Sequence, residues 1–302
     1  MVKKGNFMEN YVISCCSTSD LNKEYYTKRN INYICFHFYL GYKEYVDNFG
    51  ESISFKEFYK QMGEGVVTKT SQVNTEEFIE YFDKFLQDGK DIIHVSLSSG
   101  LSGVINSANI ARDILKEKYP ERNIIIIDSL GASSGYGLLM DTLANYRDEG
   151  KSINEAASLI EGLKLNLHHW FFSTDLTYYV RGGRISKSSG FIGNVLHICP
   201  LLNMDNNGRL IPREKILGKK RVIQAIFNKM VENAVDGINY SGKCFISNSD
   251  CYEDAKTLAS LIESKFLSLK GKVEIFDVGT TIGSHTGPGT VALFFFGKVR
   301  SN

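Results

Sequence analysis

The feature that most constrains the fold is a regular alternation of strand, Ser/Gly loop and helix between residues 91 and 146. Residues 91–97 and 123–128 form short apolar runs that are typical of buried strands, and a Ser/Gly loop follows each of them. Apolar residues then recur at helical spacing over 104–115 and 138–146. This alternation predicts a parallel sheet with helices on its faces, in which ligands bind where strands end and helices begin.

The sequence pattern changes after about residue 165. Helical spacing continues over 222–235 and 254–266, but extended segments become more frequent, at 170–174, 210–217, 243–247, 273–277 and 290–296. We therefore predict an N-terminal α/β domain with a parallel sheet over residues 10–165 and a C-terminal α+β domain over residues 166–302.

Composition argues against several classes of function. The chain has 35 basic and 34 acidic side chains, so a net charge near +1 supplies no field that would attract nucleic acid. No apolar run approaches the roughly 18 residues needed to span a bilayer, and no secretory signal follows Lys3 and Lys4. We therefore expect a cytoplasmic protein without membrane spans. The six cysteines form no C-x-x-C pair with zinc spacing, so no metal site is expected.

The most specific motif is S-S-G-L-S-G at residues 98–103, between a predicted strand and a predicted helix. Backbone N–H groups at a helix start bind anions, and the hydroxyls of Ser98, Ser99 and Ser102 add donors. The motif lacks the lysine of a P-loop and the spacing of a dinucleotide-binding loop. It indicates either an anion site of another kind or a loop that only turns the chain and caps the helix.

Three further loops are rich in hydrogen-bond donors. T-K-T-S-Q at 68–72 carries Thr70 and Ser71, just before a helix predicted over 74–86. V-R-G-G-R-I-S at 180–186 projects guanidinium groups from a tight turn, and S-H-T-G-P-G-T at 284–290 places His285 among small residues. No loop supplies a cluster of carboxylates or metal ligands, so the shared chemistry favours binding of an anionic group.

Seven segments, in this order, resemble the DegV family of bacterial lipid-binding proteins: C-S-T-S-D-L at 16–21, T-S-Q at 70–72, S-S-G-L-S-G at 98–103, I-D-S at 127–129, G-G-R-I-S at 182–186, P-L-L at 200–202 and H-T-G-P-G at 285–289. The resemblance implies a two-domain α/β architecture with a long-chain fatty acid buried between the domains. It also implies that the protein can act as the acyl-carrying subunit of a fatty acid kinase. In that role it presents the carboxylate to a dihydroxyacetone-kinase-like partner that forms an acyl phosphate.

The resemblance also assigns ligand-binding residues. It places the carboxylate-binding loops at Thr70, Ser71, Ser98 and Ser99, the head-group histidine at His285 and the G-G-R arginine at Arg184. It implies a carrier with no catalytic residue and no cofactor of its own. The sequence departs from the family pattern in three places: Cys16 stands for an aspartate, Val73 for a proline, and Lys215, Ile216 and Leu217 for K-V-R.

A lipid ligand agrees with elementary energetics. A tail of about 15 methylenes contributes about 12 kcal/mol of transfer free energy before ordering and association costs. A buried carboxylate without partners would cancel much of that gain, so the head group must meet several donors. An apolar stripe predicted to be helical offers candidate tail contacts at Phe191, Ile192, Val195 and Leu196, although such stripes are more often plain core.

Two other functions fit parts of the sequence. G-A-S-S-G at 131–135 matches G-x-S-x-G, so a serine hydrolase would use Ser133 with Asp250 or Asp277 and His285. A phosphate-ligand-binding protein would instead use the 98–103 loop with basic side chains at Arg184, Lys219, Lys220 and Arg221.

Overall fold

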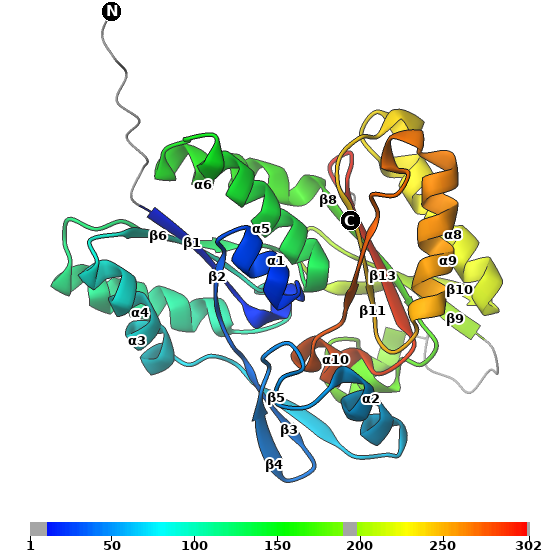
Figure 1. The fold of residues 1–302 in the computed structure, drawn as a ribbon. Helices are drawn as coiled ribbons and strands as arrows, with labels where there is room; N and C mark the ends of the chain where they lie inside the picture. The colour runs from blue at the N-terminus through cyan, green and yellow to red at the C-terminus, as the bar shows by residue number, and fades with distance from the viewer. Residues whose placement is uncertain (1–10, 190–197, 301–302) are drawn as a thin grey trace, which may run out of the picture.

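The computed structural model describes residues 11–189 and 198–300, which form three sheets and the helices around them (Figure 1). Sheet A is entirely parallel, with the order β2-β1-β6-β7. Its strands are β1 (Tyr11–Cys16), β2 (Asn32–Ile34), β6 (Asp91–Ser96) and β7 (Ile124–Asp128). The parallel sheet predicted from the alternation is therefore confirmed.

Helices cover both faces of sheet A. They are α1 (Lys23–Lys28), α3 (Thr75–Gln87), α4 (Val104–Lys118), α5 (Ser133–Asp148) and α6 (Ile153–Leu163). α3 and α4 lie on one face, and α5 and α6 on the other (Figure 1). Helix α3 begins at the predicted position because Asn74 and Glu77 form a capping box. Helix α5 begins within the predicted loop, because its first turn is made of small residues without an apolar stripe.

Sheet C belongs to the second half of the chain and has the order β10-β9-β8-β13-β11-β12. Its strands are β8 (Leu167–Ser173), β9 (Ile198–Met204), β10 (Leu210–Leu217), β11 (Cys244–Asn248), β12 (Glu274–Asp277) and β13 (Thr290–Phe296). Only β11 and β12 pair in parallel, so the sheet is mixed. Its helices are α7 (Thr177–Arg181), α8 (Lys219–Asn233), α9 (Tyr252–Lys265) and α10 (Thr280–Thr286).

The two larger sheets share helix α5. Helices α8 and α9 bury one face of sheet C, and α5 packs against its other face. The opposite side of α5 contacts β1 of sheet A, so every residue from Ser133 to Asp141 is buried. The resulting main core contains side chains of both halves, for example Ile93 of sheet A and Phe294 of sheet C. The predicted fold class is therefore confirmed, while the boundary at residues 165 and 166 remains a prediction.

A third, antiparallel sheet projects from the N-terminal half (Figure 1). It contains β3 (His37–Leu40), β4 (Lys43–Val46) and β5 (Thr68–Ser71), with α2 (Phe55–Gly63) packed against it. The sequence patterns did not predict it. This small sheet contacts α10 from the C-terminal half, and thereby contributes to the site described below. No helix in the described residues has the length and apolar character needed to cross a bilayer.

Candidate ligand-binding site

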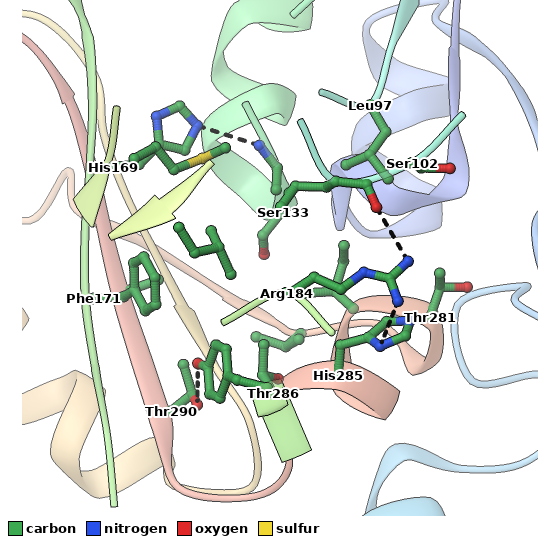
Figure 2. Close-up of a pocket in the computed structure, with 18 of the residues that line it drawn as sticks. Leu97, Ser102, Ser133, His169, Phe171, Arg184, Thr281, His285, Thr286 and Thr290 are labelled. Carbon is green, nitrogen blue, oxygen red and sulfur yellow. Dashed lines mark hydrogen bonds between the residues drawn. The ribbon is translucent and has the colours of Figure 1, made fainter. Parts of the chain in front are cut away.

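A cavity of about 210 Å³ lies between the carboxyl ends of the sheet A strands, the inner face of sheet C and helix α10. Apolar side chains from all three parts form its walls, among them Leu97, Leu101, Phe171, Met204, Ile282 and Phe294. Figure 2 shows the polar side chains Ser102, Arg184, Thr281 and His285 at one side and Phe171 and His169 at the other. The cavity is therefore apolar with one strongly polar end, which we call the polar end.

Thr70 faces the cavity because of the two-residue period of strand β5. Thr68 and Thr70 are half-buried, whereas Lys69 and Ser71 are exposed on the opposite face. Pairing of Phe38 with Thr70 sets this register. The strand thus brings one hydroxyl of the T-S-Q motif to the polar end and directs the other to solvent.

Arg184, His285 and Thr70 form a chain of hydrogen bonds at the polar end. Arg184 Nη1 lies 3.4 Å from His285 Nδ1, and His285 Nε2 lies 2.8 Å from Thr70 Oγ1. A guanidinium can only donate, so Nδ1 accepts and Nε2 carries the ring proton and donates to Thr70. The hydroxyl proton of Thr70 is then directed elsewhere, and it is available to a ligand oxygen.

The electrostatics of His285 agree with this assignment. Burial, together with the nearby positive charge of Arg184, lowers the pKa of His285 from 6.5 to about 3. The ring is therefore neutral at physiological pH. A neutral ring has one N–H group and one acceptor nitrogen, as the hydrogen-bond chain requires.

Arg184 is held in place by backbone carbonyls. Its Nη1 donates to Gly182 O at 2.5 Å and its Nη2 donates to Leu101 O at 3.1 Å. The side chain thereby ties the G-G-R turn to the 98–103 loop. Gly182 is required here because a Cβ atom at this position would collide with His285 Nδ1.

Arg184 also carries the only formal charge among the described residues that line the cavity. No carboxylate in the described part of the chain forms an ion pair with it. Burial lowers the pKa of His169 well below 6.5, so the opposite side of the cavity is neutral. The cavity therefore presents one uncompensated positive charge at its polar end.

Three polar residues of the cavity lining were not among the binding residues that the family resemblance assigns. Ser102 donates to Gln72 Oε1 at 3.0 Å, and both side chains line the cavity. Ser102 belongs to the S-S-G-L-S-G motif and Gln72 to T-S-Q, so the motifs contained the signal. Thr281 also lines the cavity, but no sequence motif pointed to it.

The structure brings Thr70, Arg184 and His285 together and places Ser71, Ser98 and Ser99 outside the cavity lining. Ser98 is fully buried, and its hydroxyl donates to Gly208 O at 2.8 Å, which links the 98–103 loop to the β9–β10 turn. Ser99 is exposed, and its backbone N–H donates to Asp128 Oδ1 at 3.2 Å. Direct binding of the ligand by these three serines stays a prediction.

The three departures from the family pattern also lie outside the lining that the described residues form. Cys16 is fully buried with its Sγ 3.7 Å from His94 Nε2, and Val73 is buried at the start of α3. Leu217 is 54% exposed at the end of β10. The expected tail contacts Phe191, Ile192, Val195 and Leu196 lie outside the described residues.

The structure does not assemble the hydrolase triad. Ser133 lines the cavity, but its Oγ donates to Asp20 Oδ2 at 2.5 Å and also contacts Ser247 Oγ at 3.0 Å. Both ring nitrogens of His285 are engaged by Thr70 and Arg184. The serine and the histidine of the expected triad therefore have other partners.

The proposed phosphate site is not assembled either. Lys219 lines a separate cavity that contains Asp250 and Asp277, and it pairs with Asp254 at 2.7 Å. Arg184 does not line that second cavity. Among the described residues, no group of three or more His, Cys, Asp or Glu side chains could hold a metal ion.

Fold and site together define a class of protein: a mixed α/β protein with an apolar cavity whose polar end presents hydrogen-bond donors and one positive charge. The chain belongs to the DegV family, since the sequence profile described as "uncharacterised protein, DegV family" matches residues 13–298. The resemblance inferred from the seven motifs is thereby confirmed.

Individual relatives agree with this assignment. A DegV domain-containing protein of Clostridium perfringens is 38% identical over 97% of this chain and 99% of its own. A DegV lipid-binding protein of Thermotoga maritima has a TM-score of 0.82 at 26% identity, covering 97% of this chain and 100% of its own. A stearic-acid-binding protein of Eubacterium ventriosum has a TM-score of 0.82 at 25% identity, covering 96% and 99%.

Proposed function

We propose that this protein binds a long-chain fatty acid, with the carboxylate at the polar end and the tail along the apolar walls. The observation that carries the proposal is the uncompensated charge of Arg184 at one end of an otherwise neutral, apolar cavity. A fatty acid is a monoanion with a single polar end, so its charge distribution complements that of the cavity. The stearic-acid-binding relative supports this ligand class.

The proposed head-group site consists of Thr70, His285 and Arg184. Thr70 donates its hydroxyl proton to a carboxylate oxygen, because His285 already donates to Thr70 Oγ1. Arg184 orients His285 and supplies the favourable electrostatic potential. Hydrogen bonds to a charged oxygen are stronger than neutral ones, which offsets the desolvation of the carboxylate.

Extraction of the purified protein with organic solvent, followed by mass spectrometry, tests this proposal. We expect a retained fatty acid of about 14 to 18 carbons. The cavity-filling variant Ala292→Phe should retain much less of it, because Ala292 lines the cavity. Lys69→Ala, on the outward face of β5, serves as the matched control and should retain as much as the wild type. A wild-type protein without any bound acyl chain, even after incubation with palmitate, would contradict the proposal.

We also propose that a kinase acts on the bound ligand. The protein performs no chemistry itself and presents the carboxylate to a dihydroxyacetone-kinase-like protein in the cytoplasm. In the complex with that kinase, a carboxylate oxygen of the fatty acid attacks the γ-phosphorus of ATP, ADP leaves, and an acyl phosphate forms. A third, open depression of about 500 Å³, distinct from the one that Lys219 lines, supports this role, because it contains Arg209 and shares Leu101, Arg184 and Leu210 with the cavity. We expect acyl phosphate to form only when such a kinase, ATP and the lipid-loaded protein are combined.

A further inference from the structure

The open depression beside the cavity carries two arginines. It is formed by the 98–103 loop, the G-G-R turn and the first residues of strand β10, and both Arg184 and Arg209 line it. No acidic side chain is among the described residues of this lining. Since each arginine is always charged, the depression presents two positive charges where the cavity presents one.

Neither guanidinium is neutralised by a carboxylate. Within the described residues, no ion pair includes Arg184 or Arg209. Asp205 lies in the same turn, but its Oδ1 accepts from the backbone N–H of Asn207 at 2.9 Å and of Arg209 at 2.8 Å. Asp205 therefore stabilises the β9–β10 turn, and the side chain of Arg209 stays exposed at the depression.

Arg184 is shared by the depression and the cavity, and it retains hydrogen-bond donors. A guanidinium has five N–H groups. In Arg184, Gly182 O, Leu101 O and His285 Nδ1 engage three of them. Nε makes none of these bonds, and it is not among the sealed polar atoms of the described structure, so it keeps contact with solvent. Arg184 can therefore donate to an anion without leaving its present partners.

The charge of the depression suits a phosphate at the end of an acyl chain. A fatty acid carries one negative charge, whereas a phosphate group carries close to two at neutral pH. Phosphoryl transfer to the carboxylate thus adds negative charge just beyond the head group that faces Arg184. Arg209 adds a positive charge on that side. Arginine also suits phosphate in shape, because its planar guanidinium donates two parallel hydrogen bonds to phosphate oxygens.

We propose that the depression binds the phosphate group of an acyl phosphate whose tail stays in the cavity, with Arg184 and Arg209 as its cationic partners. The inference rests on the proposed function and extends it from the fatty acid to its phosphorylated product. The cavity and the depression share Leu101, Arg184 and Leu210, so one ligand contacts both. A free phosphate offers the same charge without a tail, and the experiment distinguishes the two.

The test uses the full-length protein freed of lipid and the stable analogue palmitoylmethylphosphonate, in which a methylene replaces the bridging oxygen of palmitoyl phosphate. Palmitate is the comparison ligand, and titration calorimetry measures both affinities. We expect Arg209→Gln to weaken phosphonate binding at least about 5-fold, because it removes charged hydrogen bonds. Palmitate binding should change by less than about 2-fold, since Arg209 does not line the cavity.

Two further variants control for charge and fold. Arg209→Lys keeps the positive charge and should restore part of the lost affinity for the phosphonate. Arg221→Gln removes an exposed arginine of α8 that lines neither the cavity nor the depression, and it should bind both ligands as the wild type does. Unchanged phosphonate affinity in Arg209→Gln, or an equal loss for both ligands, would overturn the assignment.

Inorganic phosphate tests whether the tail is required. We expect it not to bind the palmitate-loaded protein at concentrations at which the phosphonate saturates the lipid-free protein. Arg209-dependent binding of inorganic phosphate, together with no binding of the phosphonate, would overturn the acyl phosphate as the ligand.

Failure of this inference differs from failure of the proposed function. Tight palmitate binding by the wild type, with phosphonate binding that does not depend on Arg209, would overturn the phosphate site alone. A wild type that binds neither palmitate nor the phosphonate would overturn both.

Discussion

His285 Nε2 lies 2.8 Å from Thr70 Oγ1, although 215 positions separate the two residues in the chain. The contact joins helix α10 of the C-terminal half to strand β5 of the small sheet in the N-terminal half. It also orients the hydroxyl of Thr70, because His285 donates to Thr70 Oγ1 and the hydroxyl proton must therefore point away from the ring. The polar end of the cavity therefore exists only when the two halves of the chain are packed together.

Thr70→Val should weaken palmitate binding about 10-fold or more, because the variant loses the hydroxyl proton that we assign to the carboxylate. Thr70→Ser retains the hydroxyl and should bind nearly as tightly as the wild type. Isothermal titration of the lipid-free proteins measures both affinities. Wild-type affinity in Thr70→Val would exclude Thr70 as a direct donor.

The stability of the protein should fall below pH 6.5, in part through His285. Its pKa is about 3 in the folded state, against 6.5 for a free ring, so between these values the unfolded chain binds the extra proton. The stability that this neutral ring provides is complete above pH 6.5 and is lost as the pH falls toward 3. Burial also lowers the pKa of His94 to about 3 and that of His168 to about 4, so both add to the same trend.

Urea unfolding at pH 7.5 and pH 5 measures the share that belongs to His285. We expect the difference in unfolding free energy between the two pH values to be smaller in His285→Asn, by up to about 2 kcal/mol. The half-buried position of the ring makes this figure an upper limit. An unchanged pH dependence in the variant would show that the ring is protonated without cost in the folded state.

Ser98→Ala should lower the unfolding free energy by about 1–3 kcal/mol, because it leaves the carbonyl of Gly208 without its donor in a buried contact. Palmitate affinity of the folded variant should stay within about 3-fold of the wild type. Denaturant unfolding and palmitate titration separate the two effects. The opposite result, lost binding with unchanged stability, would support the carboxylate-binding role that the family resemblance assigns to Ser98.

Gly182→Ala should reduce palmitate retention, because the added Cβ atom displaces the ring of His285 from Arg184. Gly162→Ala in α6 is the matched control, since no heavy atom lies within 4 Å of a Cβ atom at that position. The control should retain palmitate fully and gain up to about 1 kcal/mol of stability, as alanine favours a helix over glycine. Equal retention in the two variants would contradict the steric argument.

Much of the fold could be predicted because its elements have strong local patterns. Strands β6 and β7 are continuous apolar runs, and α3 carries both an apolar stripe and a capping box. Strands β3 and β4 escaped prediction because each has only four residues and presents one face to solvent. They pair with each other through a short turn, but β3 also pairs with β5, about thirty residues further along the chain, which no local pattern reveals.

Short patterns of residue types were sufficient to predict the parallel sheet, the donor-rich loops and the DegV resemblance. Which donors share one cavity depends instead on how the two halves of the chain pack together. Thr70 and Ser71 are adjacent in sequence, yet strand pairing turns one inward and the other outward. Thr281 belongs to no motif, and its place in the cavity lining follows only from the packing of α10. Side-chain direction and long-range contact are properties of packing, which a short sequence pattern does not encode.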